Sequence, residues 1–191
     1  MRIPSPVSLL REPRYRTLRE IAWFTAVTLL IHFGYRYWSA GLDFRPVAGF
    51  MAVLQETLTD LVFRQSSWIN AHILGLQMEV TGRTMTFPNT SWILVNASCA
   101  GDKQILQFMI LLLVSRGSWK NKGWFIPLGM LILHGTNVLR IVLLSIVSVN
   151  MPQYWHLAHN TVLRGMFYVV ILILWIIWTE RISPAKTQLT N

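Results

Sequence analysis

The chain has 191 residues, of which 53% are hydrophobic and 13% charged, and its mean hydropathy is +0.43. An ordinary soluble domain carries roughly 25% charged residues, so this composition excludes a fold whose whole surface faces water. The net charge of +9 would suit a nucleic-acid-binding protein. The basic residues, however, are divided among the ends of apolar segments instead of gathered on one face, so we expect no nucleic-acid partner. The composition indicates an integral membrane protein in contact with membrane lipids.

Four apolar segments with helical periodicity predict the membrane spans. They cover about residues 20–38, 101–115, 124–149 and 159–179. About 20 helical residues cross the ~30 Å hydrocarbon core of a bilayer. We therefore predict an all-α membrane protein, a multi-pass helical bundle of about four spans, that forms a single integral membrane domain over residues 1–191.

The distribution of arginine and lysine predicts the orientation of the bundle. Basic residues gather in residues 1–19, in the turn at 116–122 and just after the last span, at Arg181 and Lys186. Loops rich in arginine and lysine face the cytoplasm. We therefore expect a basic cytoplasmic N-terminus, a cytoplasmic turn at 116–122 and a cytoplasmic C-terminus, where residues 183–191 form a short polar tail.

The stretch between the first two spans has two different periodicities. Residues 47–76 repeat apolar side chains every three or four positions, while their other face carries Glu56, Asp60 and Arg64. These charges would lie in lipid if the helix crossed, so we predict an amphipathic helix on the outer interface or against the bundle. From residue 78 to 87 the period becomes two around Thr81-Gly82-Arg83, which predicts a small β-hairpin followed by a third extended piece at 92–95.

Polar side chains on the outer side of the predicted bundle are the candidate site. Cys99 stands just before the span at 101–115, and His156 and His159 stand at the start of the last span. Arg140 lies inside the span at 124–149, roughly 24 Å along it. An ionised side chain inside a bilayer costs at least ~2.5 kcal/mol and is by default a functional hypothesis. The topology therefore gathers a thiol, a guanidinium and an imidazole at similar depth.

Each of these residue types has an ordinary structural role when it is taken singly, but their convergence favours chemistry. A thiolate is a nucleophile, an imidazole transfers protons, and a fixed guanidinium stabilises an oxyanion. Cys99 is the single cysteine, which excludes an intrachain disulfide. His32 and His134 are predicted to pack in the bundle, and Asp102 and Lys103 to form a structural pair. No spacing of His, Cys and Asp resembles a ligand set, so we expect no metal and no cofactor.

Three ordered motifs resemble the exosortase/archaeosortase family over roughly residues 47–178. They are Cys99-Ala100-Gly101 opening an apolar helix, Asn137-Val138-Leu139-Arg140 within the next helix and His159 opening the last. The resemblance implies a membrane-embedded cysteine protease or transpeptidase of a prokaryotic cytoplasmic (inner) membrane, with its active site facing outward. Cys99, Arg140 and His159 would then be catalytic, with His156 as the alternative to His159.

The resemblance also implies the class of substrate. Exported proteins with a C-terminal hydrophobic sorting helix would be cleaved at their sorting signal through a thioester on Cys99. His159 is preferred because His156 is predicted to lie in a loop, and Asp102-Lys103 departs from the usual apolar continuation, which indicates a subfamily variant. Two alternatives stay open, a membrane protease that stops at hydrolysis and a non-catalytic subunit of an envelope or exopolysaccharide assembly system.

Overall fold

The computed structural model describes residues 22–23, 25–30, 33–34 and 45–183. Residues 1–19, most of the polar tail and half of the first predicted span lie outside the described residues. The described residues of that span are helical. The chain divides into two compact units, Met1–Asp43 and Phe44–Asn191, and the second unit contains the candidate site.

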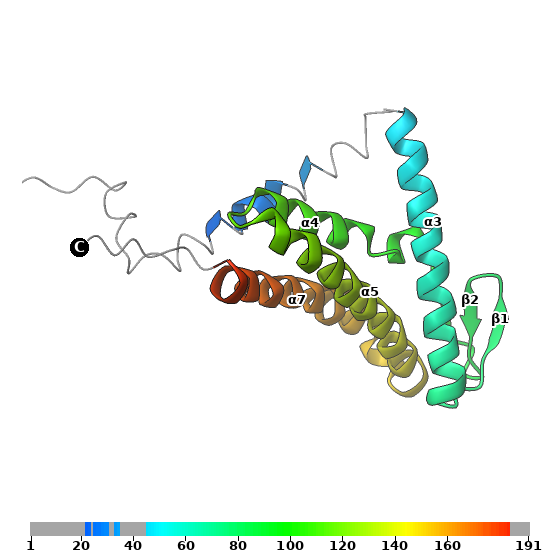
Figure 1. Ribbon diagram of the computed structural model, residues 1–191. Coiled ribbons are helices and arrows are strands. Elements are labelled where there is room, and N and C mark those ends of the chain that lie inside the picture. Colours follow the sequence, from blue (N-terminus) through cyan, green and yellow to red (C-terminus); the bar gives the residue numbers. More distant parts are fainter. Residues whose placement is uncertain (1–21, 24, 31–32, 35–44, 184–191) are drawn as a thin grey trace, which may run out of the picture. The chain divides into compact units, whose positions relative to one another are not determined.

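The described part of the second unit is mostly helical. Its elements are, in chain order, helix α3 (Arg45–Trp68), π-helix η2 (Ile69–Ile73), strands β1 (Glu79–Thr81), β2 (Thr84–Thr86) and β3 (Trp92–Leu94), 3-10 helix η3 (Ala97–Cys99), helices α4 (Asp102–Val114) and α5 (Trp119–Asn150), 3-10 helix η4 (Pro152–Tyr154), helix α6 (Trp155–Leu157), π-helix η5 (Ala158–Val162), helix α7 (Leu163–Ile177) and π-helix η6 (Trp178–Ile182). Helices α4, α5 and α7 pack against one another, and α3 crosses them (Figure 1).

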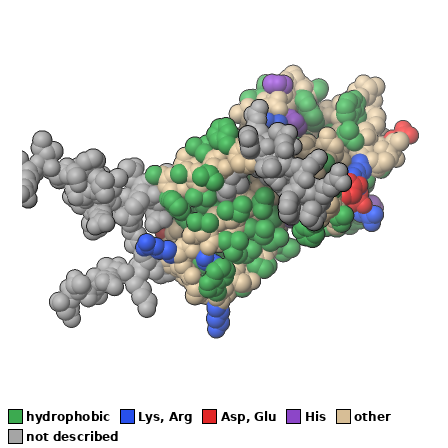
Figure 2. Space-filling model, turned by 90° about the horizontal axis from the view of Figure 1, so that it is seen from above, with side chains coloured by type: hydrophobic (Ala, Val, Ile, Leu, Met, Phe, Trp, Pro, Cys, Tyr) green, Lys and Arg blue, Asp and Glu red, His purple; other side chains and the backbone are tan. Residues whose placement is uncertain are grey.

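Two helical stretches are long and apolar enough to cross a membrane among the described residues. They are Trp119–Asn150 and Pro152–Ile182, which contain two of the four predicted spans. Many of their large apolar side chains are exposed, and hydrophobic side chains cover the middle of the face seen in Figure 2. Helix α4 has 13 residues and rises only about 20 Å. The structure thus provides two helices of membrane length, and the count of four spans stays a prediction.

The last helical stretch begins earlier than its periodicity predicted. Its first residues form η4 and α6, which lead without a break into η5 and α7. His156 therefore lies in α6, and the expectation that it lies in a loop is wrong. The reason is that Pro152 occupies the first turn, where a proline costs no helical hydrogen bond.

Helix α3 confirms the predicted amphipathic helix and packs against α5 and α4. Thr59, Val62, Ser66 and, in the adjoining π-helical turn, Asn70 are completely buried at spacings of three and four residues. The Nδ2 atom of Asn70 donates to Oγ of Ser145 on α5, at 2.7 Å. A polar contact inside the bundle thus fixes how α3 lies along α5.

The predicted hairpin and the extended piece after it form one antiparallel sheet of order β1-β2-β3. Met85 is opposite Val80 on one side and Ile93 on the other. Met85 and Ile93 are buried and belong, with Val142 of α5, to the core cluster that also contains Cys99. The sheet therefore packs on the same part of α5 as the loop that carries the cysteine.

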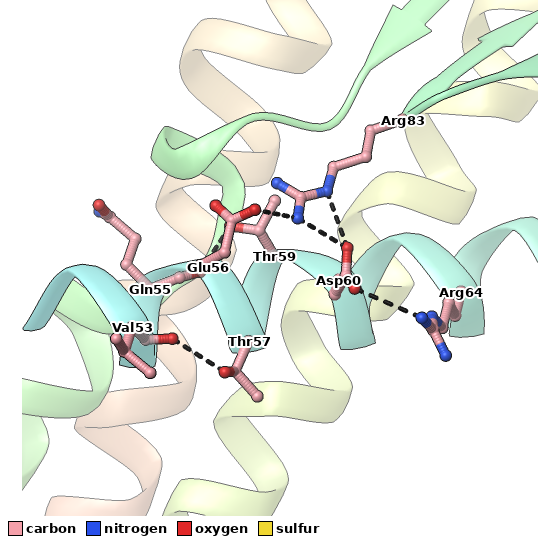
Figure 3. A network of polar contacts seen from close by, with 8 residues as sticks. All are labelled: Val53, Gln55, Glu56, Thr57, Thr59, Asp60, Arg64 and Arg83. Atoms are coloured by element: carbon pink, nitrogen blue, oxygen red, sulfur yellow. Dashed lines mark hydrogen bonds and ion pairs between the residues drawn. The ribbon is translucent and has the colours of Figure 1, made fainter. Parts of the chain in front are cut away.

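An ion-pair network connects the turn of the sheet to α3 (Figure 3). Arg83 donates through Nε to Asp60, at 2.8 Å, and through its terminal nitrogen to Glu56, while Arg64 also pairs with Asp60. The hydrogen bond and charge of Arg83 lower the pKa of Glu56. Because these carboxylates are exposed, the network sets the position of the turn on α3 and contributes little to stability.

Helices α4 and α5 come very close together at Gly129. A Cβ atom at this position would lie 2.2 Å from the ring of Phe108, which is completely buried. Such a distance is well inside van der Waals contact, so any side chain at position 129 would displace the ring. The glycine therefore allows α4 to lie directly on α5.

The C-terminal end of α4 is closed by a buried lysine. The ammonium of Lys122 donates to the carbonyl oxygens of Leu113 and Ser115, at 2.9 and 2.7 Å, and lies 4.9 Å from the centroid of the Trp119 ring. A helix end leaves carbonyl oxygens without intrahelical donors and carries partial negative charge. Part of the basic turn is therefore a structural cap of α4.

Replacing Lys122 with Met should destabilise the protein by about 3 kcal/mol, because one buried and one partly buried carbonyl oxygen would lose a charged donor. The measurement is the thermal unfolding midpoint of the purified protein in detergent. Lys120→Met is the matched control, since Lys120 is exposed and lies in the same first turn of α5. Equal midpoints for the two variants would contradict the capping role.

Candidate active site

The backbone around Cys99 is shaped by a short capped turn. Asn96 accepts a hydrogen bond at its Oδ1 from the N–H of Ser98, at 3.0 Å, and starts η3. Cys99 ends this turn, is 9% exposed and precedes Gly101, whose φ of +77° turns the chain into α4. Glycine adopts this left-handed conformation without the cost that a Cβ imposes. The sequence prediction that Cys99 stands at the start of a helix is confirmed.

Asn137 of α5 holds this turn in place. Its Nδ2 donates to the carbonyl oxygen of Cys99 at 2.6 Å, and its side chain is 1% exposed. A Cβ on Gly101 would lie 2.9 Å from the same Nδ2. The missing side chain at position 101 therefore makes room for the amide that binds Cys99.

Arg140 lies one turn further along α5 and is 8% exposed. Its Nε is buried without a hydrogen-bond partner among the described residues. Asn137, one turn earlier on the same face of α5, donates to the carbonyl oxygen of Cys99. Arg140 therefore lies on the face of α5 that meets the turn of Cys99.

Arg164 is a residue that the sequence interpretation overlooked. It occupies the first turn of α7, within a strongly apolar segment. A charged residue in such a segment is the same signal that singled out Arg140. Applied to both helices, that signal would also have singled out Arg164, which is exposed.

His159 lies in η5, on a stretch that packs against α5. Its ring stacks on Trp155 at a centroid distance of 5.6 Å, and its Nδ1 lies 3.0 Å from Oδ1 of Asn160. Since an amide oxygen only accepts, a hydrogen bond in this contact is donated by Nδ1. Within the described part of the chain, no hydrogen bond or ring contact joins His159 to Cys99 or Arg140.

The histidine segment, which consists of α6 and η5, is nevertheless part of the same packed region. Leu163, just after it, belongs to the core cluster that contains Cys99, and Trp155 and Ala158 pack against that cluster. His159 is partly buried, while His156 is exposed. The structure thus sets the turn of Cys99 on the face of α5 that carries Arg140 and places His159 on an adjoining helix.

Two other polar residues of the prediction have structural partners. Asp102 accepts from Nε2 of Gln55 on α3 at 3.3 Å, and His134 lies 2.9 Å from Oε1 of Gln65. Both contacts join α3 to the bundle. The described residues contain no group of three or more His, Cys, Asp or Glu side chains that could hold a metal ion.

Replacing Gly101 with Ala should disturb the turn that carries Cys99. The left-handed backbone costs about 1 to 2 kcal/mol with any Cβ, and the added atom would push the Asn137 amide away from Cys99. We expect a lower unfolding midpoint in detergent and faster alkylation of Cys99 by N-ethylmaleimide. Gly135→Ala is the control, because a Cβ at position 135 would have no neighbouring atom within 4 Å. Unchanged alkylation in Gly101→Ala would show that the turn does not depend on this glycine.

A comparison with models of protein families identifies the family of this chain. The model described as transmembrane exosortase matches residues 17–177, which include the turn at Cys99, the motif at Asn137 to Arg140 and the histidine segment. No curated protein and no solved structure matches the chain significantly. The match covers most of the sequence, and the family is one of membrane proteins. The chain therefore belongs to the transmembrane exosortase family.

Proposed function

We propose that this protein is a membrane-embedded cysteine transpeptidase that cleaves the C-terminal sorting signal of exported proteins at the outer face of the cytoplasmic membrane of a prokaryote. The observation that carries the proposal is the buried Cys99 just before α4, whose carbonyl oxygen is bound by Asn137 one turn before the buried Arg140 on α5. Family membership supports the same reaction. Substrates would present a C-terminal hydrophobic helix beside the apolar outer surfaces of α5 and α7.

The reaction begins at the cysteine sulfur, where His159 takes the thiol proton. The resulting Cys99 thiolate attacks a peptide carbonyl carbon, and the electron pair of the C=O bond moves to oxygen, where Arg140 stabilises the negative charge. The C–N bond then breaks, the nitrogen leaves with a proton supplied by His159, and a thioester remains on Cys99. An amine acceptor next attacks the thioester and gives its proton to His159, so the thiolate is regenerated.

Several contacts suit His159 to the role of proton carrier. Its Nδ1 is engaged with Asn160 and its ring is stacked on Trp155, so the imidazole has a fixed orientation. A base oriented by a third group is the usual arrangement in nucleophilic catalysis. Closure of the histidine segment toward Cys99 on substrate binding would complete the site, as catalytic hydrogen bonds often tighten only in the complex.

The first test concerns the cysteine. Strains carrying the wild type or Cys99→Ser should be compared by mass spectrometry of the C-terminal peptides of exported proteins that end in a hydrophobic helix. We expect truncated C-termini with an added group in the wild type and intact C-termini in the variant. Ser98→Ala, next to the cysteine and exposed, should retain processing.

The same spectra separate the remaining alternatives. Truncated products with a free carboxylate would show hydrolysis instead of transfer. Unchanged C-termini in the Cys99→Ser strain, relative to the wild type, would exclude a catalytic cysteine and favour a non-catalytic subunit of an envelope assembly system.

The second test separates the two histidines. His159→Ala should abolish processing while the protein still accumulates in the membrane, and His156→Ala should retain most of it, because His156 is exposed whereas His159 has partners that orient its ring. Both variants remove an imidazole from the same helical stretch, so each is the control for the other. The opposite result would assign proton transfer to His156.

The third test concerns the side of the membrane. In a Cys99→Ala background, single cysteines in place of Glu79 and Lys120 should differ in their labelling by an impermeant maleimide in intact cells, since both positions are exposed. Position 79 should be labelled and position 120 protected, because basic turns face the cytoplasm. Labelling of position 120 alone would reverse the orientation and place the site inside.

A further inference from the structure

Two buried polar atoms beside Cys99 lack partners among the described residues. They are Oδ1 of Asn137, an acceptor, and Nε of Arg140, a donor, and both side chains are more than nine-tenths buried. A buried polar atom without a hydrogen bond is destabilising, because it has lost its contact with water and gained no partner. Residues three apart on a helix lie on the same face, with Cβ atoms about 5 to 6 Å apart. One donor and one acceptor without partners are therefore left on the face of α5 that holds the turn of Cys99.

The orientation of the Asn137 amide follows from its contact with Cys99. Its Nδ2 is 2.6 Å from the carbonyl oxygen of Cys99. The reverse orientation would bring two oxygen acceptors to that distance, which is repulsive. The close approach of Gly101 further confines the amide. Oδ1 is therefore fixed as the unpaired acceptor.

A peptide group offers one N–H donor and one C=O acceptor, the complement of this pair. We infer that Asn137 has two roles, in which Nδ2 positions Cys99 and Oδ1, together with Nε of Arg140, binds one peptide group of the substrate. Oδ1 accepts from the amide N–H, and Nε donates to the carbonyl oxygen. The inference rests on the proposed function and deepens it, because the substrate is recognised here by its main chain and not by a side chain.

The two roles make different demands on a test. Loss of the bond from Nδ2 to Cys99 affects every reaction of the thiol, whereas loss of the acceptor Oδ1 affects only partners that carry an N–H. Iodoacetamide and methyl iodoacetate both place a carbonyl next to the carbon that reacts, and only iodoacetamide has an N–H. The ratio of their alkylation rates at Cys99, normalised to glutathione, therefore reports on Oδ1 without a substrate.

The experiment measures this ratio in the full-length protein in membranes. In the wild type we expect a preference for iodoacetamide of at least about tenfold, the effect of one hydrogen bond of about 1.4 kcal/mol. Asn137→Leu should abolish the preference and should also change both absolute rates, because the turn at Cys99 loses its anchor. Asn70→Leu is the matched control, since Asn70 is an equally buried asparagine that binds Ser145 elsewhere in the bundle.

Three results would overturn the inference. They are an equal ratio in the wild type and Asn137→Leu, the same loss of preference in Asn70→Leu, and a wild-type Cys99 that iodoacetamide does not modify. None of these results depends on whether sorting signals are processed. Processing that survives in Cys99→Ser would instead refute the proposed function and leave the reagent ratio as an independent finding about the site.

Discussion

A backbone carbonyl in an apolar interior needs a hydrogen-bond donor, and at several places in this protein the donor is a side chain from another element. Asn137 of α5 donates to the carbonyl oxygen of Cys99, and Lys122 donates to a carbonyl oxygen at the end of α4. Asn89, in the loop before β3, donates to the carbonyl oxygen of Ser148 near the end of α5. Without such a donor, each of these carbonyl groups would be buried at a cost in free energy, because it has lost its hydrogen bonds to water. The polar side chains therefore decide where each chain segment ends and against which helix it lies.

The same requirement links the site to the fold. Cys99 does not lie within a regular helix but at a left-handed turn just before one, and that turn is stable only because α5 supplies an amide and Gly101 leaves space for it. Arg140 lies one turn later on the same helix. The proposed nucleophile, its anchor and the helix face that carries the guanidinium are thus positioned by a single contact between α5 and the turn before α4, while the histidine belongs to a separate helical stretch.

Much of the fold could be predicted from periodicity alone. The amphipathic α3, the change to strands near residue 78 and the apolar stretches of α5 and α7 all have repeats long enough to identify. The start of the last helical stretch could not be predicted in this way, because Pro152 is compatible with both a loop and a first helical turn. The burial of Lys122 was equally hidden, since a lysine among basic residues reads as a solvated charge until the end of α4 is seen beside it.

The close packing of α4 on α5 has a consequence for variation far from the cysteine. Because a Cβ at position 129 would meet the ring of Phe108, α4 lies directly on α5 at this point, and its first residue, Asp102, follows closely on the turn of Cys99. A methyl group at position 129 would therefore push Phe108, and α4 with it, away from α5. The turn of Cys99 would then lie farther from Asn137 and Arg140, although no residue of the site had changed.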